Sequence, residues 1–185
     1  MVLAQCNRLG VLFLCRVFGM RFAIPYLRNP SPALSVPLLR RLGAKVGEMS
    51  TVKRSIFLDN VYEDANSCGT LNYLEIGTNC YIGDCVYFDL SNRIRIEDNA
   101  VVSGRVSFVT HADCNRSEFL RERFPRQSAR IKVGRGAWVG FGATLLNGVA
   151  LGEEAVVAAS SLVRDNIPPR ELWGGTPARC IRKLE

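Results

Sequence analysis

The chain contains a single histidine, His111, and this side chain is the first candidate for chemistry. An imidazole titrates near neutral pH, so it can take a proton from an attacking hydroxyl and return it to a leaving group. His111 opens a long polar segment, residues 110–130. It could also serve Cys114 as the base of a nucleophile pair, although no third, orienting group stands nearby. The alternative is that His111 is a surface histidine without a catalytic role.

The seven cysteines indicate neither a disulfide framework nor a zinc site. None of them has CxxC or zinc-finger spacing, and oxidative pairing of an odd number would leave one over. We therefore expect reduced thiols, a cytoplasmic location and no bound metal. Cys80 is expected to pack in the core. A zinc site of the carbonic anhydrase kind needs several histidines, and this chain has one.

A six-residue period organises the elements that must position His111. Large apolar residues recur every six positions, and a mostly small residue follows each of them four positions later. Neither a helix nor a simple strand gives this spacing. Three such units make a coil of about 18 residues, so the period predicts a prism-shaped solenoid of stacked coils. The unbroken run is Val133, Val139, Leu145, Leu151, Val157 and Val163.

The same period runs upstream of His111 but is interrupted. Residues 59–75 are polar and replace two hexapeptides with looser chain, and residues 110–130 form a second, longer interruption. A long loop on a regular scaffold needs a reason, which is often function. The upstream positions are Val46, Val52 and Leu58, then Ile76, Ile82 and Phe88, and after a two-residue insertion Ile96, Val102 and Phe108.

Helices are expected at both ends of the solenoid. One should lie between Ser35 and Gly43, and another should begin at Thr176–Pro177, which suit the N-cap and first helical positions. The chain then divides into a helical extension over residues 1–42, a repeat domain over 43–169 with its loop at about 110–130, and a cap helix over 170–185.

The net charge of +7 belongs to the N-terminal extension. Seven of the 24 basic residues precede Glu48, the first acidic residue, so the remaining 17 balance all 17 acidic residues. The apolar run Leu9–Leu27 is interrupted by Arg16, Arg21 and Pro25, which argues against a transmembrane helix, and it lacks a signal-peptide cleavage site. The extension either packs on the body or a neighbouring subunit, or contacts an anionic membrane surface peripherally.

Several motifs together resemble the hexapeptide-repeat acyltransferases. They are the TH pair before the long loop, the stretch VGRGAWVGFGATLLNGVALGEEAVVAASSLV and the closing GGTPARCIRKL. The relatives are the galactoside, maltose, xenobiotic and polysaccharide-biosynthesis acetyltransferases, and the resemblance covers about residues 43–185. It implies an all-β fold, a left-handed parallel β-helix with short N-terminal helices and a C-terminal helix. The handedness comes from the family alone, because general crossover rules favour right-handed connections.

The resemblance also implies a function and a site. It implies an O-acetyltransferase that moves acetyl from acetyl-CoA to a hydroxyl of a sugar or polysaccharide precursor, through a tetrahedral intermediate. His111 would be the general base, Asp89 would contact the acceptor, and a backbone N–H in residues 140–142 would stabilise the oxyanion. The protein would be a homotrimer with acetyl-CoA in a groove between prisms. The implied cofactor contacts are Trp138, Phe141, Ala159, Arg164 and Arg182.

Some points stay open within the resemblance. Trp138 could stack beside the cofactor or simply cap a coil edge. Relatives often carry a Thr-Lys pair where this chain has Arg164-Asp165. An amino-sugar N-acetyltransferase and a non-catalytic scaffold subunit are the alternative functions. Nucleic-acid binding is not expected, because the body lacks a basic, aromatic-studded face.

Overall fold

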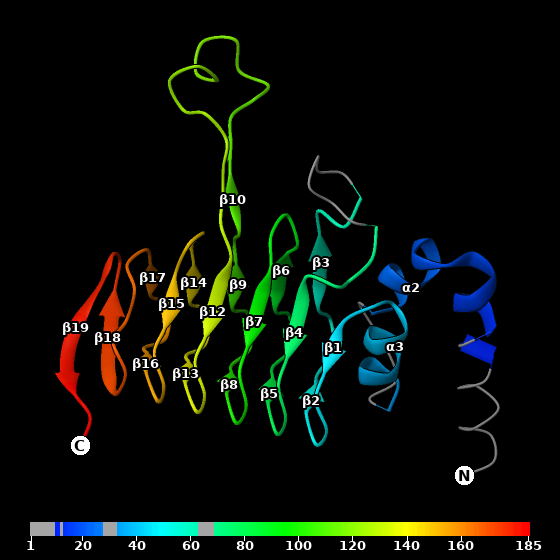
Figure 1. The fold of residues 1–185 in the computed structure, drawn as a ribbon, viewed down its shortest axis with the longest axis horizontal. Helices are drawn as coiled ribbons and strands as arrows, with labels where there is room; N and C mark the ends of the chain where they lie inside the picture. The colour runs from blue at the N-terminus through cyan, green and yellow to red at the C-terminus, as the bar shows by residue number, and fades with distance from the viewer. Residues whose placement is uncertain (1–9, 12, 28–32, 63–68) are drawn as a thin grey trace.

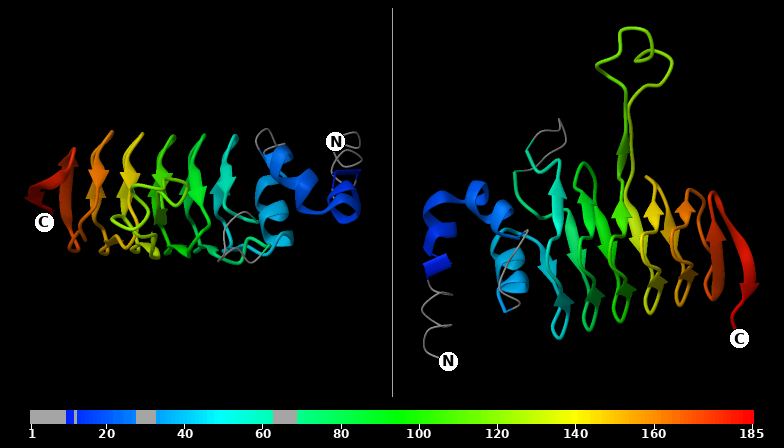
Figure 2. Two further views of the ribbon diagram at one scale, coloured as in Figure 1. Left: turned by 90° about the horizontal axis from the view of Figure 1, so that it is seen from above. Right: turned by 180° about the vertical axis from the view of Figure 1, so that it is seen from behind.

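A computed structural model of the chain describes residues 10–11, 13–27, 33–62 and 69–185. Short strands stack coil upon coil along one axis, with helices at the N-terminal end and a hairpin at the C-terminal end (Figure 1). The strands of successive coils lie one behind another when the molecule is seen from above (Figure 2). This architecture confirms the parallel solenoid that the six-residue period predicts.

Five coils of three strands each form the body. The first three coils comprise β1 Lys45–Val46, β2 Thr51–Val52, β3 Phe57–Asp59, β4 Leu74–Ile76, β5 Tyr81–Ile82, β6 Tyr87–Asp89, β7 Ile94–Ile96, β8 Val101–Val102 and β9 Ser107–Phe108. The last two comprise β12 Ile131–Val133, β13 Trp138–Val139, β14 Thr144–Leu145, β15 Ala150–Leu151, β16 Val156–Val157 and β17 Leu162–Val163.

The strands form three faces of a prism. Face A is β1-β4-β7-β12-β15, face B is β2-β5-β8-β13-β16 continued by the C-terminal strands, and face C is β3-β6-β9-β14-β17. Each coil passes from face A to face B to face C and then returns to face A, one coil further on. We call the passage from face B to face C the B–C edge, and the return to face A the C–A edge.

The period residues fill the interior. Every apolar position from Val133 to Val163 is at most 1% exposed, and the small residues four positions later are buried too. Phe88 and Phe108 stack in consecutive coils with ring centroids 5.3 Å apart. The coils approach so closely that a Cβ on Gly140 would lie 2.6 Å from the Ala159 nitrogen, which explains the glycine after the inward residue. Leu58 is only partly buried, unlike Val46 and Val52 of the same coil.

The predicted C-terminal helix over residues 170–185 is wrong. Instead β18 Glu171–Gly175 pairs in parallel with β16, and β19 Ala178–Lys183 turns back antiparallel to it. The last coil leaves the backbone groups of β16 unpaired on one side, and a strand satisfies them where a helix could not. Thr176 and Pro177 form the turn of this hairpin rather than the start of a helix.

Helices lie among the described residues before the first coil. Helix α3, Ser35–Arg41, covers the first coil, and α2, Met20–Leu27, precedes it. Ala23, Leu27 and Leu38 have no exposed surface, so both helices close the open end of the core. Among the described residues, no helix combines the length and hydropathy needed to cross a membrane.

Both irregular segments lie at the C–A edge. One joins β3 to β4, and the other joins β9 to β12. The second begins with β10 His111–Ala112, which pairs antiparallel with β11 Gln127–Ser128. The intervening residues 113–126, which we call the arm, stand away from the prism (Figures 1 and 2). The predicted interruption at 110–130 is therefore confirmed as a projecting loop.

Candidate active site

His111 lies at the C–A edge, where the arm leaves the prism. Its Nδ1 is 2.6 Å from Oδ2 of Asp89. The His111 side chain is 25% exposed, whereas the Asp89 side chain is not exposed at all. One imidazole nitrogen is thus held by a buried carboxylate, and Nε2 is the nitrogen left for a substrate. A base oriented by a carboxylate in this way is typical of acyl-transfer sites.

The Asp89 carboxylate is fully provided with hydrogen-bond donors. Its Oδ2 also accepts the backbone N–H groups of Thr110, at 2.7 Å, and His111, at 3.0 Å. Its Oδ1 accepts the Ser91 N–H, at 3.1 Å, and the Asn60 side-chain amide, at 2.9 Å. Burial by itself raises the pKa of Asp89, but the hydrogen bonds from His111, Ser91 and Asn60 outweigh it and lower the pKa below its ordinary value. The carboxylate is therefore ionised at neutral pH.

The register of face C brings the pair together. Phe88 of β6 is the parallel partner of Phe108 of β9, so the residues that follow these two phenylalanines reach the same edge in adjacent coils. The Thr110 hydroxyl donates to the Asp89 carbonyl at 2.8 Å and accepts the Asn92 N–H at 3.0 Å, which ties the two turns together. The two-residue insertion between Phe88 and Ile96 falls in this turn and makes room for it.

A second layer of polar groups supports Asp89. Asp59 occupies the same position one coil earlier and accepts the Tyr87 hydroxyl at 2.5 Å. Burial and the Asp59 carboxylate raise the pKa of Tyr87 above its ordinary value, so the hydroxyl stays protonated and donates. The sequence did not single out Tyr87, Asp59 or Asn60. The signal that could have found Asp59 is its equivalence to Asp89 in the repeat.

Asp89 does not lie where an acceptor contact was expected. Its side chain has no exposed surface, and its oxygens face His111 and backbone N–H groups. In this geometry it orients His111 rather than meeting a substrate.

Three of the implied cofactor residues gather at face B and the B–C edge. Trp138, in β13, and Phe141, just after it, are each about half exposed, and the Trp138 indole donates to the Ser103 hydroxyl at 3.1 Å. The Arg105 guanidinium lies 5.7 Å from the Phe141 ring centroid. Ala159 stands in the next coil at the same edge. These residues form a continuous small-and-aromatic surface, but His111 lies at a different edge of the same prism.

The other two implied cofactor residues lie elsewhere. Arg164 follows β17 at the C–A edge, and its guanidinium is 3.6 Å from the Asp165 carboxylate. Arg182 is exposed on β19, the outermost strand of face B. A single chain therefore does not bring Arg164 and Arg182 to Phe141.

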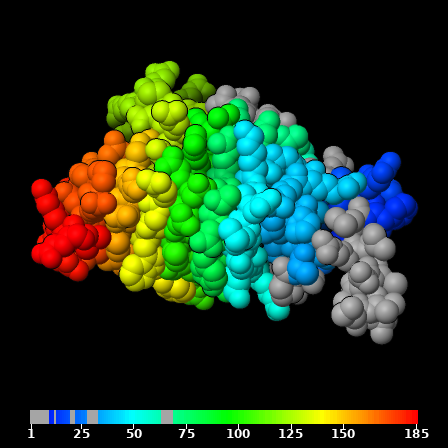
Figure 3. Space-filling view, turned by 60° about the horizontal axis from the view of Figure 1, so that its bottom comes forward, coloured from blue at the N-terminus to red at the C-terminus, as the bar shows by residue number. Residues whose placement is uncertain are grey.

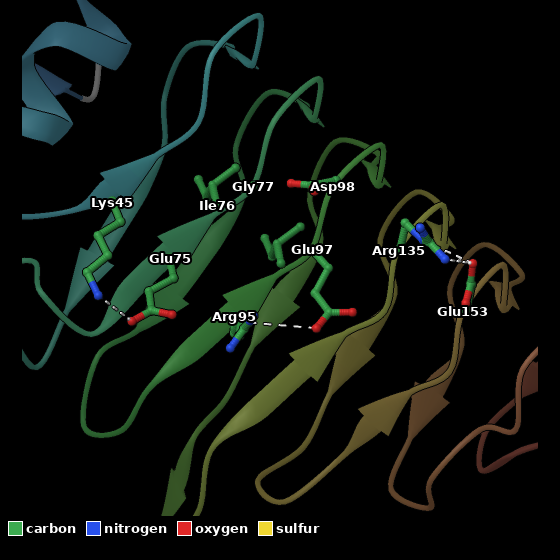
Figure 4. Close-up of a pocket in the computed structure, with 10 residues that line it drawn as sticks. Lys45, Glu75, Ile76, Gly77, Arg95, Glu97, Asp98, Arg135 and Glu153 are labelled. Atoms are coloured by element: carbon green, nitrogen blue, oxygen red, sulfur yellow. Dashed lines mark hydrogen bonds and ion pairs between the residues drawn. The ribbon is translucent and has the colours of Figure 1, made fainter.

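A surface hollow of about 530 Å³ lies on face A and excludes His111. Its charged side chains point across the strands toward one another (Figure 4). They pair as Lys45 with Glu75 at 3.2 Å and Arg135 with Glu153 at 2.6 Å. Exposed, mutually paired charges of this kind form a solvated ladder rather than a catalytic pocket.

The cysteines of the described residues are free thiols, and Cys6 and Cys68 lie outside those residues. Cys80 is 2% exposed, which confirms core packing. Cys114 Sγ lies 3.6 Å from the Phe124 carbonyl, while His111 Nδ1 is engaged by Asp89. Among the described residues, no group of three or more His, Cys, Asp or Glu side chains is placed to hold a metal ion.

Comparison with known proteins shows which family this geometry resembles. Galactoside O-acetyltransferase of Escherichia coli is 30% identical over 118 residues, which is 60% of this chain and 58% of that protein. A hexapeptide-repeat-containing acetyltransferase of Vibrio cholerae, solved in complex with acetyl coenzyme A, is 25% identical with a TM-score of 0.72, covering 88% of this chain and 84% of that one. The chain is similar in sequence and fold to the hexapeptide-repeat acetyltransferases.

A second match is shorter. Mitochondrial gamma carbonic anhydrase 2 of Arabidopsis thaliana is 58% identical over 50 residues, which is 26% of this chain and 18% of that protein. The chain thus spans less than two thirds of these curated relatives. No protein-family model matches it. The resemblance that the TH pair and the repeat indicated is confirmed by the acetyltransferase matches.

Proposed function

We propose that this protein is an O-acetyltransferase that moves an acetyl group from acetyl-CoA to a hydroxyl of a sugar or polysaccharide precursor. The observation that carries the proposal is the buried Asp89 carboxylate 2.6 Å from Nδ1 of the only histidine, at the base of the arm. Acetyl-CoA is bound in the matched Vibrio cholerae structure, and the Escherichia coli relative is named for a galactoside acceptor. Both facts support this donor and this class of acceptor.

In the proposed reaction Nε2 of His111 takes the proton of the acceptor hydroxyl as its oxygen attacks the thioester carbonyl. A C–O bond forms, the tetrahedral oxyanion collapses, the C–S bond breaks, and His111 returns the proton to the departing thiolate. Asp89 fixes the tautomer of His111 and stabilises the imidazolium that forms. Base catalysis of this kind contributes about a hundredfold to ten-thousandfold.

The oxyanion donor is assigned to the B–C edge. In residues 140–142, the Gly140 N–H donates to the Val157 carbonyl and the Gly142 N–H donates to the Gly104 carbonyl. The Phe141 N–H is the one of these three with no such bond among the described interactions, so we assign the oxyanion to it.

We further propose a homotrimer built on left-handed coils. His111 at the C–A edge and Phe141 at the B–C edge lie on different edges of one prism, so base and cofactor meet only if a second copy supplies one of them. Chains carrying His111→Ala and chains carrying Phe141→Arg, refolded together, should then recover activity that neither has alone. The molar mass from light scattering should be that of three chains.

The decisive experiment measures thiol release from acetyl-CoA with a panel of sugars and amino sugars. Sugar-dependent release that falls at least about a hundredfold in His111→Ala supports the proposal. Cys114→Ser is the control and should release thiol like the wild type; its failure would instead favour a cysteine nucleophile. Release only with amino sugars would indicate an N-acetyltransferase. No release and no acetyl-CoA binding by calorimetry would indicate a scaffold subunit.

A further inference from the structure

The helical turns over residues 13–18 present an apolar face to solvent. Phe13, Leu14, Val17 and Phe18 are exposed by 63%, 36%, 55% and 60%. Phe13 and Val17 are four positions apart, as are Leu14 and Phe18, so the four side chains form one continuous arc of the helix surface. Cys15, between them in sequence, is buried, and the helix therefore rests on the molecule by its opposite side.

A left-handed residue separates this segment from the rest of the extension. Gly19 has φ +60, and its N–H closes the preceding helix on the Cys15 carbonyl at 3.0 Å. The following helix α2 buries Ala23 and Leu27. The described part of the apolar run Leu9–Leu27 is therefore divided: α2 closes the core, whereas Phe13, Leu14, Val17 and Phe18 face outward. The blue segment protrudes at the N-terminal end of the molecule, beyond the first coil (Figure 3).

The excess positive charge of the chain lies in the same N-terminal part of the sequence. All seven excess cations precede Glu48, and the rest of the chain is formally neutral. Arg16 is exposed within the apolar segment itself. Arg41 of α3 is close enough to act on the pKa of the Cys15 thiol, which burial raises overall. Arg16 thus lies on the segment itself and Arg41 lies near its buried Cys15, and the sequence places no anion among residues 1–47.

We propose that Phe13, Leu14, Arg16, Val17 and Phe18, the docking face, bind the surface of an anionic lipid bilayer. Aromatic and aliphatic side chains would enter the boundary between headgroups and acyl chains, while the surrounding cations would pair with anionic headgroups. The helix would lie in the interface plane. This inference goes beyond the proposed function and does not depend on it.

Charge decides between a bilayer and a second copy of the chain. A symmetric contact of this face with itself would place the cations of one copy against those of the other. Residues 48–185 are formally neutral, so they offer no excess negative charge that would offset this repulsion between two copies. An anionic bilayer complements both the apolar arc and the charge around it.

Flotation of the full chain with lipid vesicles tests the proposal. We expect binding to phosphatidylcholine vesicles that contain about one third phosphatidylglycerol, weak binding to phosphatidylcholine alone, and loss of binding at high salt. The double variant Phe13→Ser/Phe18→Ser and the single variant Arg16→Glu should each reduce the bound fraction at least about tenfold. Met49→Ser is the matched control, because Met49 is 80% exposed but outside the docking face.

Three outcomes would overturn the proposal. They are equal binding to neutral and anionic vesicles, no binding to either, and binding that both docking-face variants leave unchanged. Light scattering adds a further check: a double variant with altered molar mass and unaltered vesicle binding would show that the face seats a second copy. Arg16→Glu keeps the test informative if the double variant does not fold. Thiol release with water-soluble acceptors should be the same in all variants, which separates this result from the proposed activity.

Discussion

The C–A edge and the B–C edge of the prism are built by opposite means. At the C–A edge the hexapeptide period is broken after β3, after β6 and after β9, and the last break forms the projecting arm, whose first residue His111 meets the buried Asp89 at the end of β6. At the B–C edge the period holds from Trp138 to Val163, so the turns stay tight and leave aromatic side chains on a smooth surface. A regular scaffold thus acquires a polar site by irregularity and an even surface with exposed aromatic side chains by regularity.

Removing the buried carboxylate should have the largest effect and would show that the C–A edge depends on it. Asp89→Ala leaves the N–H groups of Thr110 and His111 without their acceptor and frees the imidazole to rotate. We expect a loss of about 3–5 kcal/mol of unfolding free energy and thiol release reduced at least about a hundredfold. Denaturant titration and the thiol assay measure the two effects. Wild-type stability with reduced activity would restrict Asp89 to orienting His111.

Adding a side-chain atom at the B–C edge should destabilise the protein less than removing the Asp89 carboxylate. Gly140→Ala places a Cβ 2.6 Å from the Ala159 nitrogen, so neighbouring coils must separate. We expect about 1–3 kcal/mol of destabilisation, measured as a lower thermal midpoint. Gly10→Ala is the control, because nothing lies within 4 Å of a Cβ there. Equal midpoints for the two variants would mean that the coil spacing is not fixed by this contact.

Acid pH should destabilise the C–A edge through Asp89. The pKa of Asp89 is lowered in the folded protein, so its contribution is present above the ordinary carboxyl pKa and is lost as pH falls through the lowered value. Asp89→Asn puts an amide donor against backbone donors and should cost about 1–3 kcal/mol at neutral pH. The difference in unfolding free energy between this variant and the wild type should narrow below about pH 4. Denaturant titration at several pH values measures this difference, and a difference that is constant with pH would contradict an ionised Asp89.

Trimming the aromatic surface should have the smallest effect. Phe141→Ala removes a half-exposed ring that packs beside Arg105. We expect the KM for acetyl-CoA to rise up to about tenfold with little change in kcat, since a single aromatic contact contributes about 0.5–1.5 kcal/mol. Tyr81→Ala, on the same face, is the control. A fall in kcat alone would place Phe141 in the chemical step rather than in cofactor binding.

The sequence by itself determined the body of this protein. The period fixes which side chains point inward, because a hexapeptide turn and its small corner residue are local features that repeat. The interruption at 110–130 and the sole histidine at its start were likewise legible without coordinates, and so was the short helix before the first coil.

Only the tertiary structure decided what surrounds His111. Asp89, Asn60 and Tyr87 are far from His111 in sequence, and they approach it because β3, β6 and β9 are in register and two long connections leave the prism at one edge. The C-terminal strands were missed for a similar reason. Thr176–Pro177 suits a helix start locally, but the unpaired edge of β16 is a feature of the assembled sheet, and it draws the chain into a hairpin.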